Sequence, residues 1–305
     1  MKHLISIHDL EKSDMEQIFK MSETLKKQMK EGLQHHILQG KTLGMIFTKS
    51  STRTRVSFEV GMYQLGGYPL FLSANDIQLG RGESIYDTAK VLSRYIDGIM
   101  IRTFKQSDVE DLAKYGSVPV INGLTDLMHP CQILTDLFTV YEQKHKLEGL
   151  KLAYVGDGNN VANSLLHGCA KVGMDITVAS PKGFECNKQI VEEAKEDARK
   201  SGSKIVLTED SEEAVCNADV VYTDTWVSMG QEAEKEQRIN TFMPYQVNKE
   251  LFSKAKEDAM FLHCLPAYRK YEVTSEIIDG PQSYVFDEAE NRMHVQKAIM
   301  ATLMG

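Results

Sequence analysis

The sequence predicts an α/β protein with two doubly wound domains, each a parallel sheet flanked by helices, and a C-terminal helix that packs back. Short apolar, β-branched runs alternate with longer charged segments of helical period, the pattern of parallel sheets covered on both faces. The length of 305 residues suggests two domains, at about 150 residues each. The polar segment Glu142–Gly149 separates a long helical pattern from a new apolar run. We therefore expect domains at 1–145, completed by a helix at 288–305, and at 150–287.

The apolar runs between the helical segments have the length and composition of buried strands. They are Thr42–Phe47, Tyr68–Leu72, Gly98–Arg102, Val118–Asn122, Lys151–Val155, Asp175–Ala179, Lys204–Leu207, Val220–Thr223 and Met260–His263. Between them, apolar residues recur at i, i+4 and i+7 or i+8, as in Val56/Val60/Tyr63 and Ile133/Leu137/Tyr141. This spacing is typical of amphipathic helices.

Composition excludes several classes of protein. The formal net charge of -8 argues against nucleic-acid binding, which needs a basic face. No apolar run approaches the roughly eighteen residues of a membrane span, and residues 1–30 lack the apolar core of a signal peptide. The five cysteines are scattered, with no C-x-x-C pair, which suits neither a disulfide framework nor a zinc site. We expect a cytoplasmic protein with small-molecule ligands and neither metal nor cofactor.

The loop after the first predicted strand is rich in hydroxyl and guanidinium groups. Ser51, Thr52, Arg53 and Thr54 open a helical pattern directly after that strand. In parallel sheets, ligands bind beyond the carboxyl ends of the strands. A helix start offers free N–H groups and a positive dipole end, and arginine adds forked donors for phosphate. A plain helix cap with solvated arginines is the alternative, but the crowding of these groups favours a phosphate site.

Two further loops of the first half carry polar residues at strand ends. Arg102 ends a predicted strand; alone it could equally be a surface residue, but beside the anion loop it is a candidate for polarising a carbonyl oxygen. His129 precedes Pro130, which suits the first position of a helix. His129 could donate to a developing oxyanion or be a structural cap, and Gln132 could accept from an amide.

The first loop of the second half, Gly156–Val161, partly matches a dinucleotide-binding turn. Val161 stands where that motif needs its last glycine, so the match is weak, although a nucleotide-linked oxidoreductase remains an alternative. Asn159 and Asn160 offer amide groups suited to the carboxylate or amine of an amino acid.

Two later loops add an acid and a thiol. Asp224 could bind a substrate ammonium or cap a helix, and Trp226 beside it could be simple core packing. Ser228–Gly230 could present donors to a carboxylate. Cys264 could be an inert buried thiol, or a functional group whose pKa is lowered by a positive pocket.

Together these motifs closely resemble the ornithine carbamoyltransferases. The resemblance rests on Ser51–Arg55 (STRTR), His129–Gln132 (HPCQ), Asp224 with Ser228–Gly230 (SMG), and His263–Pro266 (HCLP). It implies transfer of the carbamoyl group from carbamoyl phosphate to the side-chain amine of L-ornithine, giving L-citrulline and phosphate, in a homotrimer or a multiple of trimers. Aspartate carbamoyltransferases lack the SMG and HCLP motifs. Putrescine carbamoyltransferases typically replace SMG and extend the C-terminus, whereas this chain stops at Gly305.

The resemblance also implies roles for particular residues. The carbamoyl phosphate site would comprise Ser51, Thr52, Arg53, Thr54, Gln78, Arg102, His129, Pro130, Cys131, Gln132, Cys264, Leu265 and Arg292. Asn160, Asp224, Ser228 and Met229 would bind ornithine. Arg102, His129 and Cys264 would be catalytic.

The implied chemistry predicts a rate that rises with pH, because only the neutral amine of ornithine can attack. We expect the rise on the acid side of the pH–rate profile (its acid limb) to reflect deprotonation of the amine and of His129 together. A binding protein that holds carbamoyl phosphate without releasing phosphate remains a second alternative to the enzyme.

Overall fold

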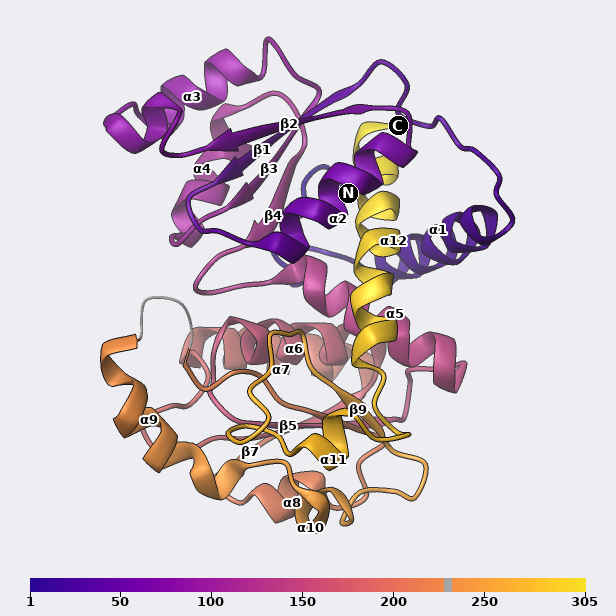
Figure 1. Ribbon diagram of the computed structural model, residues 1–305, viewed down its shortest axis with the longest axis vertical. Helices are drawn as coiled ribbons and strands as arrows, with labels where there is room; N and C mark the ends of the chain where they lie inside the picture. The colour runs from indigo at the N-terminus through magenta and orange to yellow at the C-terminus, as the bar shows by residue number, and fades with distance from the viewer. Residues whose placement is uncertain (228–231) are drawn as a thin grey trace. The chain divides into compact units, whose positions relative to one another are not determined.

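The computed structural model describes residues 1–227 and 232–305, without the side chains of residues 80, 81 and 232. The chain forms two compact units (Figure 1). The first unit is Met1–Leu134 with Asn291–Gly305, and the second is Thr135–Glu290. The chain passes from one unit to the other within two helices, α5 (Pro130–Lys144) and α12 (Val285–Met304).

The sheet of the first unit is parallel throughout, with strand order β2-β1-β3-β4. Its strands are β1 (Thr42–Phe47), β2 (Tyr68–Ser73), β3 (Gly98–Arg102) and β4 (Val120–Leu124). The other elements are α1 (Lys12–Lys30), α2 (Thr52–Gln64), η1 (Gln78–Arg81), α3 (Ile85–Leu92) and α4 (Gln106–Tyr115). The four predicted strands are confirmed, with small shifts at the ends of β2 and β4.

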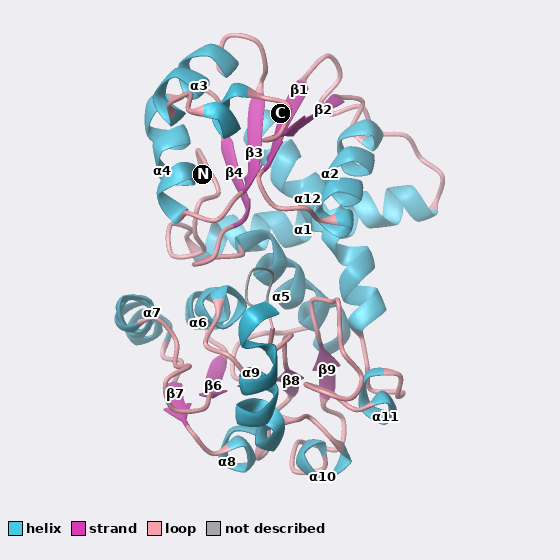
Figure 2. Cartoon of the chain, turned by 60° about the vertical axis from the view of Figure 1, so that its left-hand side comes forward, coloured by secondary structure: helices cyan, strands magenta, loops and turns pink. Residues whose placement is uncertain are grey.

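Helices cover both faces of this sheet: α3 and α4 on one, α2 and α12 on the other (Figure 2). On the first face, Ile99 and Ile101 of β3 join a buried cluster with Leu112 of α4. On the second, a Cβ atom at Gly98 would lie 2.8 Å from the Met304 sulfur. The C-terminal helix therefore packs back on the sheet closely enough to require a glycine on β3, and the predicted packing back is confirmed.

The sheet of the second unit is also parallel, with strand order β7-β6-β5-β8-β9. Its strands are β5 (Lys151–Val155), β6 (Asp175–Ala179), β7 (Ile205–Thr208), β8 (Val220–Tyr222) and β9 (Met260–Leu262). Its helices are α6 (Asn160–Val172), α7 (Lys188–Ser201), α8 (Ser211–Val215), η2 (Glu232–Glu234), α9 (Lys235–Phe242), η3 (Met243–Tyr245), α10 (Lys249–Phe252) and α11 (Ser275–Ile278). All five predicted strands are confirmed.

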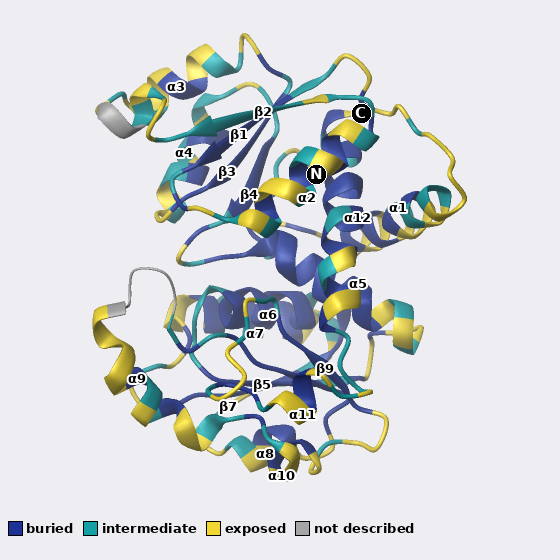
Figure 3. Cartoon of the chain, viewed as in Figure 1, coloured by how far each residue is buried: buried dark blue, intermediate teal, exposed yellow. Residues whose placement is uncertain are grey.

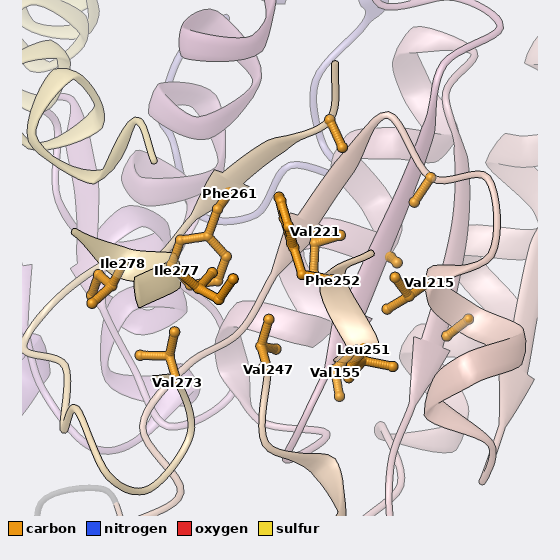
Figure 4. Packing of buried hydrophobic residues seen from close by; sticks show 14 of the residues in the cluster. Val155, Val215, Val221, Val247, Leu251, Phe252, Phe261, Val273, Ile277 and Ile278 are labelled. Atoms are coloured by element: carbon orange, nitrogen blue, oxygen red, sulfur yellow. The ribbon is translucent and has the colours of Figure 1, made fainter. Parts of the chain in front are cut away.

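One face of this second sheet packs on the short helices α8, α10 and α11. Val215, Phe252 and Ile277 of these helices meet Val221 and Phe261 of the strands in one buried cluster (Figure 4). The other face is covered by α6, which is buried along most of its length (Figure 3). Among the described residues, no helix is both long and apolar enough to cross a membrane.

Each sheet has a point where the chain reverses its direction of winding. In the first unit this point lies between β1 and β3, and in the second between β5 and β8. Open α/β sheets bind ligands beyond the carboxyl ends of the strands at this position. The loops after β1, β3, β5 and β8 are among those in which the sequence predicted site residues.

Candidate active site

The anion site predicted after β1 forms the N-terminus of α2. Ser51 is the N-cap: its side chain accepts from the Thr54 backbone N–H at 3.2 Å, and its hydroxyl bonds the Thr54 hydroxyl at 3.0 Å. Thr52, Arg53 and Thr54 make the first turn. The first turn of a helix has N–H groups without intrahelical partners and the positive end of the dipole, which are the features that bind an anion.

A distant segment of the chain reaches the same loop. Arg292 lies on α12, in the part that belongs to the first unit, and its Nη2 donates to the Thr54 hydroxyl at 3.0 Å. Both side chains are buried. The structure thus places Arg292 beside Thr54, which the resemblance assigned to the same carbamoyl phosphate site.

His129 and Arg102 are buried at the ends of neighbouring strands. Arg102 closes β3, and His129 follows β4 directly before α5. Burial holds the pKa of His129 well below its usual value, and Arg292, Arg102 and Arg53 lower it further. The imidazole is therefore neutral at physiological pH, which argues against the expectation that His129 shares the acid limb of the rate.

The residues that follow His129 occupy the first turn of α5. Pro130 is its first residue, as predicted, and Gln132 is fully buried. Cys131 is also buried: its thiol donates to the Asn122 carbonyl at 3.3 Å, and burial raises its pKa to about 12. Since its thiol is bonded to β4, Cys131 can contribute to a ligand site only through its backbone.

Gln78 lies in the exposed turn η1, which follows β2. All four strands of the first sheet are parallel, so this loop emerges at the same edge as the loops after β1, β3 and β4. The structure shows no bond from Gln78 to them among the described residues, and its role stays a prediction.

Lys49 was missed by the sequence reasoning. It is buried just before Ser51, its ammonium bonds Asp126 of the loop after β4, and it lies 4.2 Å from the ring centroid of Phe104 after β3. Lys49 thus fixes three loops of the candidate anion site relative to one another. The available signal was a lysine inside a strand-end loop, which is too common to be specific.

In the second unit, Asp224 is the centre of a buried polar cluster. One carboxylate oxygen accepts from the Cys264 thiol at 3.1 Å and from the Thr225 N–H at 2.7 Å, and the other accepts from the Asn159 amide at 2.8 Å. These residues follow β5, β8 and β9, which are neighbours in the sheet. The structure therefore brings together Asp224, predicted to bind ornithine, and Cys264, predicted to belong to the carbamoyl phosphate site.

The adjacent residues Asn159 and Asn160 have different roles. The Asn159 side chain caps α6 by accepting from the N–H groups of Val161 and Ala162, and it also binds Asp224. Asn160 is the first residue of α6 and is only partly buried. Asn159 therefore positions Asp224, whereas Asn160 can face a ligand.

Of the two alternatives for Cys264, the structure favours a protonated, buried thiol over one whose pKa is lowered by a positive pocket. Burial raises the pKa of Cys264 well above its usual value, and the carboxylates of Asp224, Glu288 and Asp136 raise it further. Within the second unit this thiol is surrounded by acids rather than by a positive pocket. Cys264 is consequently a neutral hydrogen-bond donor to Asp224.

The loop that carries Cys264 is held by a buried histidine that the sequence reasoning did not single out. The Leu265 N–H donates to His263 Nδ1 at 2.9 Å, so the ring proton lies on Nε2, which faces a Glu272 oxygen at 3.3 Å. Leu265 adopts a left-handed backbone with φ 56°. Because His263 takes its N–H, Leu265 would meet a carbamoyl amide through its carbonyl oxygen.

Ser228 and Met229, which the resemblance assigned to the ornithine site, lie outside the described residues. Trp226 is buried and stacks on Phe242 with ring centroids 5.9 Å apart, so core packing is the correct interpretation.

The structure excludes a dinucleotide site at the Gly156–Val161 turn, because another part of the chain occupies the space. The Gly158 N–H, which would face a pyrophosphate in such a turn, donates to the Phe184 carbonyl at 2.8 Å. A Cβ atom at Gly158 would lie 2.3 Å from the Cys186 nitrogen. The backbone of residues 184–186 therefore fills the space in which a phosphate would lie.

Comparison with known proteins agrees with this arrangement. Residues 2–142 match the carbamoyl-P binding domain of aspartate/ornithine carbamoyltransferases, and residues 148–303 match their Asp/Orn binding domain. The ornithine carbamoyltransferase of Caldicellulosiruptor saccharolyticus is 61% identical over 98% of this chain and 97% of its own. That of Bacillus subtilis is 58% identical over 99% and 94%. The structure of ornithine carbamoyltransferase from Pyrococcus furiosus superposes with a TM-score of 0.97 at 53% identity, covering 100% of this chain and 97% of its own.

The two matched domains, one for each parallel α/β unit, place the chain among the carbamoyl-group transferases. The chain belongs to the aspartate/ornithine carbamoyltransferase family. Within that family, the relatives that match it over nearly its full length are ornithine carbamoyltransferases.

Proposed function

We propose that this protein transfers the carbamoyl group of carbamoyl phosphate to the side-chain amine of L-ornithine, giving L-citrulline and phosphate. The first unit supports binding of the phosphate, through the N-terminus of α2, Arg53 and Arg102. The second unit supports binding of the amino acid, through Asn160, Asp224 and the loop that contains Ser228 and Met229.

The choice of ornithine over aspartate as acceptor rests on the charge of the second unit's cluster. Asp224 is buried and bonded by two neutral donors, the Cys264 thiol and the Asn159 amide. A buried carboxylate needs a positive partner, and the α-ammonium of ornithine supplies one. An acceptor with two carboxylates would instead meet a like charge here.

In the proposed reaction, each polar group of the first unit acts on a defined part of carbamoyl phosphate. The α2 N-terminus and Arg53 disperse the charge of the phosphate, which leaves as the C–O bond breaks. Arg102, the neutral imidazole of His129 and the Thr54 hydroxyl donate to the carbonyl oxygen, and the amide group of Gln132 accepts from the carbamoyl nitrogen. The neutral δ-amine attacks the carbonyl carbon, the C–N bond forms as the C–O bond to phosphate breaks, and the departing phosphate takes up the one proton that the amine loses.

In the second unit, the Cys264 thiol holds Asp224 in place, and the Leu265 carbonyl would orient the carbamoyl amide. Cys264 forms no covalent intermediate, because its raised pKa keeps it protonated. Its contribution is therefore orientation, which lowers the barrier by fixing the reacting groups.

An assay that measures citrulline and phosphate together tests this proposal. We expect one citrulline for each phosphate released, and only when both substrates are present. Asp224→Asn should raise the KM for ornithine and leave carbamoyl phosphate binding, measured by calorimetry, unchanged. Phosphate release without citrulline, or binding without either product, would contradict the assignment.

We further propose that the protein assembles as a homotrimer or a multiple of trimers. On α2, Val56, Val60 and Tyr63 form an apolar stripe that is 49%, 36% and 76% exposed. An apolar stripe on a helix is normally covered, and a second copy of the chain is the occupant that the family resemblance favours. Light scattering should give three times the chain mass of 34.4 kDa or a multiple of it, and Val60→Glu should reduce that mass. A monomeric wild type would overturn this proposal.

We also propose a cytoplasmic location. All five cysteines are free, and three of them are buried, as expected for a reducing compartment. Cell fractionation would test the proposal, and recovery of the protein outside the cytoplasm would contradict it.

A further inference from the structure

Arg238 is a buried cation of the second unit that no assigned role uses. It lies on α9, its side chain is only 4% exposed, and its guanidinium lies 4.9 Å from the ring centroid of Phe184 and 5.3 Å from that of Phe242. Burial of a charged group is unfavourable unless its donors are satisfied, so the partners of Arg238 indicate its role.

Apart from the exposed Glu234, which lies one turn earlier and 3.9 Å away, the partners of Arg238 lie in two different loops. Its Nε donates to the Trp226 carbonyl at 2.5 Å, and its Nη2 bonds the Asp157 carboxylate. Trp226 lies after β8, between Asp224 and the segment with Ser228. Asp157 lies after β5, in the turn that leads to Asn160.

The same two loops are joined a second time. The Asn159 amide, next to Asn160, donates to Asp224 at 2.8 Å. The turn that contains Asp157 is also held by the preceding strand, because the hydroxyl of Tyr154 in β5 donates to the Asp157 carbonyl at 2.9 Å. Arg238 is therefore a further bridge between the loops, beside the Asn159–Asp224 bond, and its planar guanidinium can hold both loops at a defined angle and spacing.

We propose that Arg238, with Asp157, is a positioning residue that fixes the two ornithine-binding loops relative to each other and so sets the affinity for the amino-acid end of ornithine. This inference rests on the proposed ornithine site. Without the bridge, each loop must be ordered when the substrate binds, which weakens binding. Arg53, Arg102 and His129, which are proposed to bind carbamoyl phosphate, belong to the first unit, so the affinity for carbamoyl phosphate should not change.

The bridge has a pH signature. Burial raises the pKa of Asp157 to about 6, Arg238 opposes the rise, and nearby acids add to it. The charged or titratable groups that face Asp157 are Arg238, Asp224, Glu234, Tyr154 and Cys186. Above this pKa the carboxylate is ionised and its ion pair with Arg238 is complete. As the pH falls through 6, protonation weakens the pair, and affinity at the ornithine site should fall.

Steady-state kinetics of Arg238→Met test the proposal. We expect the KM for ornithine to rise about tenfold to a hundredfold, the effect of a misplaced binding group, while kcat changes by less than about threefold. Carbamoyl phosphate affinity by calorimetry should stay at the wild-type value. Arg269→Met is the matched control, because it removes the exposed Arg269–Asp279 pair of the same unit.

The double variant Arg238→Met/Asp157→Asn covers the case in which Arg238→Met does not fold, since it leaves no unpaired buried charge. It should keep the raised KM. The probe for the pH signature is 2-aminopentanoate, an ornithine analogue without the side-chain amine. Its binding to the wild type should weaken below pH 6, whereas its binding to the double variant should not change between pH 5 and 7.

Two outcomes separate this inference from the site on which it rests. A folded double variant with the wild-type KM for ornithine would overturn the role of Arg238. An Asn160→Ala variant with an unchanged KM would overturn the proposed ornithine site itself, whatever the result for Arg238.

Discussion

At the residue scale, the sequence placed the polar groups correctly at strand ends but could not assign their chemical states. His129 is kept neutral by burial and by arginines that include Arg292, which is distant along the chain. Cys264 is kept protonated by burial and by acids that lie close to it only in the folded chain. Likewise, adjacent Asn159 and Asn160 look alike in sequence, and only the cap of α6 separates their roles. Such states depend on long-range neighbours, which local patterns do not record.

The raised pKa of Cys264 predicts slow alkylation. Only the thiolate reacts with iodoacetamide, so Cys264 should be modified much more slowly at pH 7.5 than exposed Cys216, which serves as an internal reference. Peptide mass spectrometry after timed alkylation measures both rates in one sample. Faster modification of Cys264 than of Cys216 would show that the thiol is activated after all.

The lowered pKa of His129 makes a prediction about the pH profile. Because the imidazole is already neutral near pH 6, the rise in rate between pH 6 and 9 at low ornithine should come from the substrate amine alone. His129→Asn should therefore keep the same acid limb while kcat falls about tenfold to a thousandfold, as for loss of one oxyanion donor. A limb that disappears in the variant would mean that His129 titrates in this range.

At the element scale, every strand could be predicted from its short apolar run, because parallel strands are buried on both faces. The side of α2 that packs against the rest of its unit could not be predicted. Its apolar stripe of Val56, Val60 and Tyr63 is exposed, whereas Gly61 faces α12: a Cβ atom there would lie 3.1 Å from Lys297 Cγ. The helix packs through a small residue because α12 approaches closely, and that approach depends on a segment at the other end of the chain.

The two arginines at the start of α2 should differ in function. Arg53→Met should weaken carbamoyl phosphate binding by about tenfold or more, the loss of a charge-assisted bond. Arg55→Met is the matched control on the same helix, because Arg55 already bonds Glu59 at 3.0 Å and lies 3.7 Å from the ring centroid of Phe71. Calorimetric titration of both variants tests this. Equal losses would mean that the phosphate contact is not specific to Arg53.

At the scale of the whole molecule, the two units repeat one plan: a parallel sheet with its ligand loops at the switch point. The alternation of strands and helices predicted this plan from the sequence. It did not predict that the compact units divide within α5 and α12, because continuous helices give no composition signal where one core ends and the next begins. It also could not show that residues 184–186 close the dinucleotide turn, which required the fold.

If the second unit recognises the amino-acid end of ornithine, as proposed, the enzyme should discriminate between acceptors that have this end and acceptors that lack it. Putrescine carries the same primary amine but lacks the α-carboxylate, so Asn160 and its neighbours would lose their partner. We predict that kcat/KM for ornithine exceeds that for putrescine by about a thousandfold or more, as in sites built to hydrogen-bond a group that the analogue lacks. Comparable kcat/KM values for the two amines would contradict the account.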